Sequence, residues 1–165
     1  MRTVNRCAHL VGTLPAATAT EAMELAERLL GDTLRWLPDG ETGPRHHWVK
    51  PLVDDLRGHP DLELVKDGDW SGYDKTPQFR VRKGHTLRGD SLDFGYVRCF
   101  EQSRPEFERV KARLGLPELR FQVGIPSPFD MAGIVLGRRG ALFGRGPFHD
   151  TTVAAIAEIY AQAGD

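Results

Sequence analysis

Cysteine is scarce in this sequence, and charge of neither sign is in excess. The two cysteines, Cys7 and Cys99, lie far apart in a chain of 165 residues, which suits buried thiols in a reducing compartment better than a disulfide framework. A formal net charge of -1, with acidic and basic residues interspersed, offers no electrostatic surface for nucleic acid or anionic lipid. We therefore expect a cytoplasmic protein whose partners include neither nucleic acid nor a membrane.

Long apolar segments are missing as well. The N-terminal region contains only a short apolar run from Ala8 to Val11, with no cleavage site after it, so it does not have the pattern of an export signal. No short repeat and no low-complexity segment occurs. The remaining composition, 40% hydrophobic and 27% charged, is typical of a globular protein, and we expect residues 1–165 to form a single domain.

The chain is organised around residues 34–48, with the sequence LRWLPDGETGPRHHW. The apolar run Leu34–Leu37 predicts a buried strand, and the glycines and prolines that follow it enforce turns. Beyond them, apolar residues at helical spacing predict a helix at about 46–57. A strand, a charged loop and a helix form the unit in which α/β enzymes place their chemistry, at the carboxyl end of the strand.

Two further strands are predicted at residues 7–14 and 119–126, in addition to the one at 33–38. The β-α-β order of the first part predicts that these strands run parallel, with a right-handed crossover. Residues 60–92 contain short alternating runs around the polar segment 67–73, which predict an insertion with a hairpin or an extended shape. The sequence thus predicts an α/β fold.

Helical spacing also predicts two helices in the first two thirds of the chain. One covers residues 20–30 and is capped by Thr18 or Thr20. The other begins at Tyr96, and Pro105 is expected either to kink it or to restart it behind a serine cap two residues earlier.

The C-terminal part is predicted to be helical only in places. A short helix at 129–136 is followed by a glycine-rich loop over Gly137 to Gly146. The last helix is expected at 149–163, with Asp150 as its cap. Its apolar residues share one face: Val153, Ile156, Ala157 and Tyr160.

Polar residues lie near the ends of the three predicted strands. They are His9, Thr13, Asp39, Glu41 and Ser127. If the strands are parallel neighbours, these residues converge on one rim, where carboxylates can hold an amine or a cation and hydroxyls can hold a carboxylate. The alternative is that glycine and proline merely turn the chain and the polar residues cap helices. Two acids beside one glycine are costly at a strand end unless they have a partner, which favours a binding site for Asp39 and Glu41.

The segment Arg45-His46-His47 has several interpretations. It could ligate a metal or bind an anion, but adjacent histidines on a helix point about 100° apart and seldom share one metal. We therefore favour a solvated start of the helix, and Arg45 could instead pair with Glu41 four residues before it. The remaining histidines and the cysteines show no ligand spacing, so we expect no metal site within this chain.

Two aromatic residues, Trp70 and Tyr73, lie in the polar loop of the insertion. They could form a lid over the rim at the strand ends. They could equally pack the insertion against the rest of the chain.

Two phrases of the sequence resemble motifs of cobalamin-independent methionine synthase. The run from His9 to Pro15, HLVGTLP, resembles the Gly-Ser-hydrophobic-Pro signature that opens each barrel of that family, with Thr13 where serine is usual. Gly40-Glu41, followed by Arg45 and Trp48-Val49, is similar to the family's Gly-Glu-x-x-x-Arg-x-x-hydrophobic-Val motif.

Longer phrases resemble the uncharacterised branch of the same methionine synthase and uroporphyrinogen decarboxylase superfamily. They are LPDGETGPR at 37–45, GDWSGY at 68–73 and FQVGIPSP at 121–128. The resemblance spans nearly the whole chain, in matching order and spacing.

The resemblance implies a (β/α)₈ TIM barrel, of which this chain forms the N-terminal part, with about three parallel strands and flanking helices. It also implies that Gly12, Thr13 and Glu41 hold the carboxylate and the amine of a substrate such as homocysteine. The family's zinc ligands lie on later strands, and nothing in this sequence matches them. No cofactor is therefore expected within this chain, and zinc is expected only in full-length relatives.

Three functions remain open from the sequence. The first is a methyltransferase-type enzyme, similar to methionine synthase, acting on a small amino-acid-like or carboxylated substrate. The others are a non-catalytic small-molecule binding or interaction module and an inactive truncated fragment. A complete barrel takes about 250 residues, so we expect an incomplete one whose open sheet edges favour self-association. No catalytic residue is predicted, and the predicted substrate-binding residues are Gly12, Thr13, Asp39, Glu41, Ser127, His9 and Arg45.

Overall fold

The computed structural model of the chain describes residues 7–72 and 75–164. The chain forms two compact units. The first unit comprises Met1–His47 with Arg98–Gly124, and the second comprises Trp48–Val97 with Ile125–Asp165. The described residues have a mixed α/β structure with two small sheets, one in each unit. The predicted α/β class is therefore confirmed, and the TIM barrel stays a prediction.

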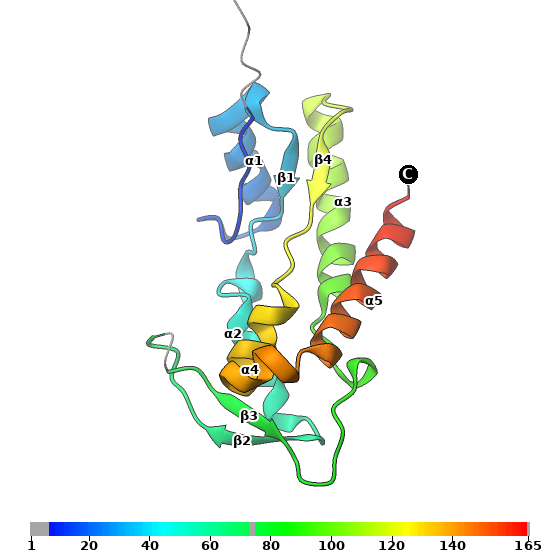
Figure 1. Cartoon of the computed structure of the whole chain (residues 1–165). Coiled ribbons are helices and arrows are strands. Elements are labelled where there is room, and N and C mark those ends of the chain that lie inside the picture. The colour runs from blue at the N-terminus through cyan, green and yellow to red at the C-terminus, as the bar shows by residue number, and fades with distance from the viewer. Residues whose placement is uncertain (1–6, 73–74, 165) are drawn as a thin grey trace, which may run out of the picture. The chain divides into compact units, whose positions relative to one another are not determined.

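The first unit is built on a parallel sheet. β1 (Trp36–Pro38) pairs in parallel with β4 (Arg120–Gln122), as Figure 1 shows. A further parallel bridge joins Ala8 to Leu34. The parallel alignment predicted for the three strands is confirmed, but the first predicted strand is reduced to this one bridge. Self-association through the edges of this sheet stays a prediction.

Two helices cover one face of the parallel sheet. α1 (Ala19–Leu30) and α3 (Tyr96–Leu114) pack their apolar stripes on Leu37 of β1. The two helices are also tied by a hydrogen bond of 2.6 Å from Thr20 Oγ1 to Glu106 Oε2. The buried core that results consists of Met23, Ala26, Leu34, Leu37, Phe107, Val110 and Leu119.

The start of α1 follows the predicted pattern. Thr18 is its cap, because the Thr18 hydroxyl accepts a hydrogen bond of 3.2 Å from the backbone N–H of Glu21. The helix ends at Gly31, where the short 3-10 helix η1 (Gly31–Thr33) begins. Of the two predicted caps, the structure therefore selects Thr18.

α3 differs from the prediction at Pro105. The helix is one element with Pro105 inside it, so the predicted restart is wrong. Phe107, just after the proline, is only 2% exposed, and burial of such side chains outweighs the loss of one backbone hydrogen bond. Ser103 does not cap a helix; its hydroxyl accepts a hydrogen bond from Arg45 instead.

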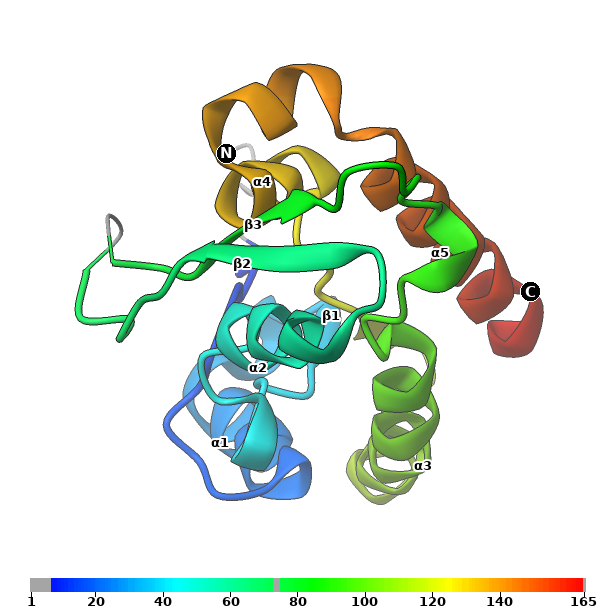
Figure 2. The same cartoon turned by 90° about the horizontal axis from the view of Figure 1, so that it is seen from below.

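The second unit contains an antiparallel hairpin. β2 (Leu62–Lys66) and β3 (Gln78–Val81) pair in opposite directions (Figure 2). This confirms the hairpin predicted within residues 60–92. Before it, α2 (Val49–Asp55) continues into the 3-10 helix η3 (Leu56–Gly58). The helix predicted at about 46–57 therefore starts later, at Val49.

The helix predicted at 129–136 is confirmed, and a second helical segment follows it. The two segments of α4 (Pro128–Phe143) meet at a kink at Gly137, whose φ of 70° and ψ of -172° are not helical. The glycine-rich loop predicted from Gly137 to Gly146 is therefore wrong over residues 138–143. Gly137 ends the first segment, because glycine adopts a positive φ at little cost.

The last helix also starts earlier than predicted. α5 (Gly146–Ala163) has Pro147 in its first turn, a position that suits proline because the missing N–H has no intrahelical partner there. Asp150 consequently lies inside the helix and is not its cap. The loop containing η4 (Gly89–Ser91) contacts α5, and Thr151 donates a hydrogen bond of 2.9 Å to the carbonyl of Leu92.

The apolar face predicted for α5 is not the buried one. The buried residues are Phe148, Thr152 and Ile159, because these face the residues that contact the helix, including Phe94, whose ring stacks on Phe148 at 6.0 Å. The large apolar residues that α5 leaves exposed are Val153, Ile156 and Tyr160.

No helix within the described residues combines the length and the apolarity that crossing a bilayer requires.

Candidate functional site

The loop after β1 brings four of the predicted site residues together. Thr13 Oγ1 donates a hydrogen bond of 3.0 Å to Glu41 Oε2. The backbone N–H of Glu41 donates one of 3.1 Å to Asp39 Oδ1, and Asp39 Oδ2 forms an ion pair of 2.7 Å with Arg45 Nη1. Thr13, Asp39, Glu41 and Arg45 thus form one connected set, the rim cluster, at the carboxyl end of the parallel sheet.

The backbone under the rim cluster has an uncommon conformation. Gly40 has a φ of 75° and Glu41 a φ of 48°, and the left-handed region costs a residue with a Cβ about 1–2 kcal/mol. The Gly40 carbonyl accepts a hydrogen bond of 2.9 Å from the N–H of Leu14, which ties the loop to the segment before α1. Such strain persists only where the surroundings enforce it, and it is concentrated at functional sites.

Arg45 connects the rim cluster to α3. Its Nη2 donates a hydrogen bond of 3.2 Å to Ser103 Oγ, and Ser103 is 3% exposed. The predicted pairing of Arg45 with Glu41 is wrong, since the partner is Asp39. The reason is that Gly43–Arg45 forms the 3-10 helix η2, and only an α-helix places side chains four residues apart beside one another. The sequence did not identify Ser103 as the partner of Arg45. It predicted a helix cap there, because a buried serine and a capping serine have the same local sequence pattern.

Cys99 lies on α3 beside the same arginine. Burial raises the pKa of the Cys99 thiol, and the neighbouring Arg45 guanidinium offsets this only in part. A thiol with a raised pKa stays protonated at neutral pH and is a poor nucleophile. Cys99 is therefore an unactivated, half-buried thiol, while Cys7, predicted to be buried as well, is exposed.

Glu41 is the acidic member of the rim cluster with a free acceptor. Both oxygens of Asp39 are engaged, whereas Glu41 Oε1 accepts no hydrogen bond from the described residues. Gly124, just beyond β4, approaches this oxygen, because a Cβ built on Gly124 would lie 3.5 Å from Glu41 Oε1. The half-buried side chain of Glu41 can therefore accept a donor from a ligand at the end of the sheet.

Gln122, at the end of β4, also belongs to this region although the sequence did not single it out. Its Nε2 donates a hydrogen bond of 2.6 Å to the carbonyl of Leu10. Phe121 stacks on Phe107 of the core at 5.1 Å, and side chains alternate along a strand. Gln122 therefore lies on the face of the sheet opposite to the core. The alternation of side chains along the predicted strand is the signal that could have identified Gln122 as a residue of that face.

Three predicted site residues have other surroundings. Ser127 lies in the second unit, where its Oγ accepts a hydrogen bond of 3.4 Å from the N–H of Asp130 and caps α4, so the helix-cap alternative holds for it. The ring of His9 packs edge-on against Trp36, with centroids 6.0 Å apart. Gly12 has a φ of 81°, and no atom lies within 4 Å of a Cβ built on it, so the chain leaves space beside this backbone.

Over residues 7–72 and 75–164, no group of three or more His, Cys, Asp or Glu side chains could hold a metal ion. The zinc ion that the resemblance implies has no ligand set in this part of the chain. His46 and His47 lie at exposed positions just before α2. This location agrees with the predicted solvated start of that helix.

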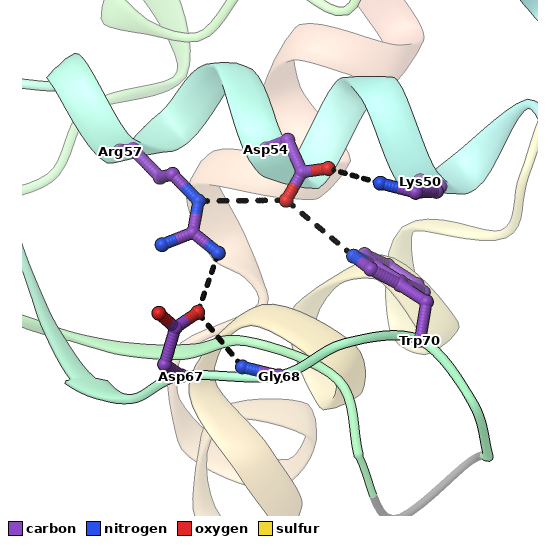
Figure 3. A network of polar contacts seen from close by, with 6 residues as sticks. All are labelled: Lys50, Asp54, Arg57, Asp67, Gly68 and Trp70. Atoms are coloured by element: carbon purple, nitrogen blue, oxygen red, sulfur yellow. Dashed lines mark hydrogen bonds and ion pairs between the residues drawn. The ribbon is translucent and has the colours of Figure 1, made fainter.

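Trp70, in the insertion, packs against α2. Its Nε1 donates a hydrogen bond of 3.4 Å to Asp54 Oδ1, and the Lys50 ammonium lies 5.8 Å from the centroid of the indole ring, as Figure 3 shows. These contacts support the packing alternative for Trp70, because the indole N–H and one ring face are already occupied within the second unit. Tyr73 lies outside the described residues.

Asp54 is the centre of this polar network. Lys50 Nζ lies 2.8 Å from its Oδ2, and Arg57, which also pairs with Asp67, lies 3.5 Å from its Oδ1 (Figure 3). Burial raises the pKa of Asp54, but the hydrogen bonds from Lys50 and Trp70 and the charges of Lys50 and Arg57 outweigh it. The pKa of Asp54 therefore lies below its ordinary value of 3.8.

We expect Asp54→Asn to destabilise the protein at neutral pH, by at most about 1 kcal/mol because the ion pairs are partly exposed. A carboxylate whose pKa is lower in the folded state contributes its full stabilisation above the unfolded pKa and loses it as the pH falls through the folded pKa. The difference in unfolding free energy between the two proteins is thus constant above about pH 5 and shrinks in stronger acid. Urea unfolding at a series of pH values measures it, and a difference that does not change with pH would contradict the assignment.

No protein-family model, no curated protein and no solved structure matches this chain.

Proposed function

We propose that the first unit binds a small amino-acid-like ligand at the rim cluster, with Glu41 accepting the ligand's ammonium group. The single observation that carries this proposal is the free Oε1 of Glu41, at the carboxyl end of parallel strands. A carboxylate beside a partly buried strand end is costly without a cationic partner. The described residues give that partner to Asp39 but not to Glu41.

The surroundings of Glu41 support a ligand with more than one polar group. Thr13 fixes one carboxylate oxygen by its hydrogen bond, so that the other oxygen has a defined position. Gly124 borders this carboxylate and carries no side chain that would fill the space beside it, and Gly12, next to Thr13, leaves its backbone open. Backbone N–H groups next to glycine are suitable donors for a ligand carboxylate.

The resemblance to the methionine synthase superfamily suggests that Gly12, Thr13 and Glu41 hold the carboxylate and the amine of such a ligand. It also suggests a methyltransferase-type enzyme. Methyl transfer to a thiol in that family uses a zinc-bound thiolate, and the corresponding ligands belong to strands that have no counterpart here. The role proposed for the rim cluster is therefore to bind the amino-acid part of the substrate.

The test is a calorimetric titration of homocysteine into the wild type and into Glu41→Gln. A charge-assisted hydrogen bond contributes about 1.5–3 kcal/mol, so we expect the substitution to weaken binding by about tenfold to a hundredfold. Glu108→Gln is the matched control, because Glu108 is exposed on α3 and we expect no change in affinity. Equal affinities for the wild type and Glu41→Gln, or no binding by the wild type, would remove the proposal.

A further inference from the structure

Four residues form a continuous chain of contacts from α3 to Glu41, the residue proposed to bind the ligand. Ser103 accepts a hydrogen bond from Arg45, Arg45 pairs with Asp39, and Asp39 accepts the backbone N–H of Glu41. We propose that Arg45 is a positioning residue for the ligand site: it holds Asp39, and through Asp39 it holds Glu41 in its binding geometry. This inference rests on the proposed function, since it concerns how the same site is kept in place.

The guanidinium of Arg45 is committed to the protein. Nη1 lies 2.7 Å from Asp39 and Nη2 lies 3.2 Å from Ser103, and the side chains of Arg45 and Asp39 are only 18% and 13% exposed. A planar guanidinium can make these two contacts in fixed directions at once, which a lysine ammonium cannot do in the same way. The resemblance alone would allow Arg45 to bind a substrate carboxylate, but its two terminal nitrogens already have partners.

The backbone of Glu41 is the element that requires positioning. Its φ of 48° is unfavourable for a residue with a Cβ, and the N–H of Glu41 is held by Asp39 Oδ1 at 3.1 Å. If Arg45 is removed, Asp39 loses the cation that fixes its other oxygen. The loop is then free to relax from the left-handed conformation, and Oε1 of Glu41 no longer has one defined position.

Two probes separate positioning from direct contact. Homocysteine carries both an ammonium and a carboxylate, and 3-aminopropane-1-thiol is the same molecule without the carboxylate. Both are titrated into the wild type, Glu41→Gln and Arg45→Gln, with unfolding curves recorded for each protein. A positioning residue acts through Glu41 and therefore through the ammonium, which both probes possess.

We expect Arg45→Gln to weaken both probes by the same factor, about tenfold. A loss restricted to homocysteine would show that Arg45 contacts the ligand carboxylate directly, and unchanged affinities for both probes would show that Arg45 has no role; either result overturns the inference. If Glu41→Gln binds both probes as the wild type does, the proposed function itself fails, and this inference fails with it.

Two milder substitutions cover the case in which Arg45→Gln does not fold. Ser103→Ala removes the contact on the α3 side and leaves the ion pair with Asp39, so we expect a smaller loss that is again equal for both probes. Arg45→Lys keeps the charge but not the planar fork, and we expect an intermediate affinity. Wild-type affinity in both variants, or a loss for homocysteine alone, would also overturn the inference.

Discussion

Replacing Leu37 with alanine is expected to lower the free energy of unfolding of the protein by about 2–5 kcal/mol. Leu37 is 0% exposed and lies in the core that β1 forms with α1 and α3. The substitution removes the transfer free energy of the deleted methyl and methylene groups and leaves a cavity among side chains that fill the interior closely. Urea unfolding followed by circular dichroism measures the loss.

The matched control for Leu37→Ala is Leu29→Ala. Leu29 lies on α1 of the same unit but is 70% exposed, and a substitution at such a position is expected to change stability by no more than about 0.5 kcal/mol. Similar losses for the two variants would contradict the packing of α1 and α3 against Leu37 of β1.

Gly40→Ala is the second substitution with a large expected effect. The φ of 75° at Gly40 costs a residue with a Cβ about 1–2 kcal/mol. The new Cβ would also lie 2.6 Å from the Cβ of Ala22 and 3.1 Å from that of Leu14, and overpacking of this kind typically costs about 1–3 kcal/mol more. Ala22 is 0% exposed on α1, so it cannot move aside without displacing the helix.

A comparison with Gly43→Ala separates the two contributions to the Gly40→Ala loss. Gly43 lies in the same loop with a φ of 63°, but no atom lies within 4 Å of a Cβ built on it. We expect Gly43→Ala to cost only the backbone term of about 1–2 kcal/mol. Thermal or urea unfolding of both variants decides the point, and equal losses would show that the close approach of Gly40 to α1 is unimportant.

The Gly40 prediction also bears on the rim cluster. Gly40 precedes Glu41, and its carbonyl is held by Leu14. An alanine that pushes this backbone away from α1 would move Glu41 as well. We therefore interpret the close contact of Gly40 with Ala22 as one of the constraints that place the carboxylate of Glu41 at the end of the sheet.

Elements with strong local signals were predicted well from the sequence. The helix after Thr18 begins with the hydrogen bond from Glu21 to that hydroxyl, because an N-cap is an interaction between residues close in the sequence. The hairpin of β2 and β3 was predicted from alternating runs on either side of a polar loop. The loop after Leu37 was predicted from its glycines and prolines, and Gly40 does adopt the positive φ that only glycine adopts freely.

Predictions that treated proline as a helix boundary were less successful. Pro105 lies inside α3, where tertiary burial outweighs the local preference, since helices in proteins are stabilised mainly by the packing of one face. Gly137 does interrupt the helix as predicted, and a second helical segment takes the place of the loop expected after it. At α5 the error is the reverse, because Pro147 lies in the first turn of the helix. The helix therefore starts before Asp150, the residue predicted to be its cap.

The rim cluster shows most clearly where the sequence and the tertiary structure each decide. The sequence by itself predicted that Thr13, Asp39 and Glu41 lie near the ends of parallel strands and hence near one another, because the carboxyl ends of such strands share an edge. Only the tertiary structure decided that Arg45 pairs with Asp39, that the buried Ser103 holds Arg45, and that Glu41 keeps a free oxygen. Periodicity and turn residues are encoded locally, whereas the choice of partner for a charged side chain depends on where distant segments meet, and here these segments are η2 and α3.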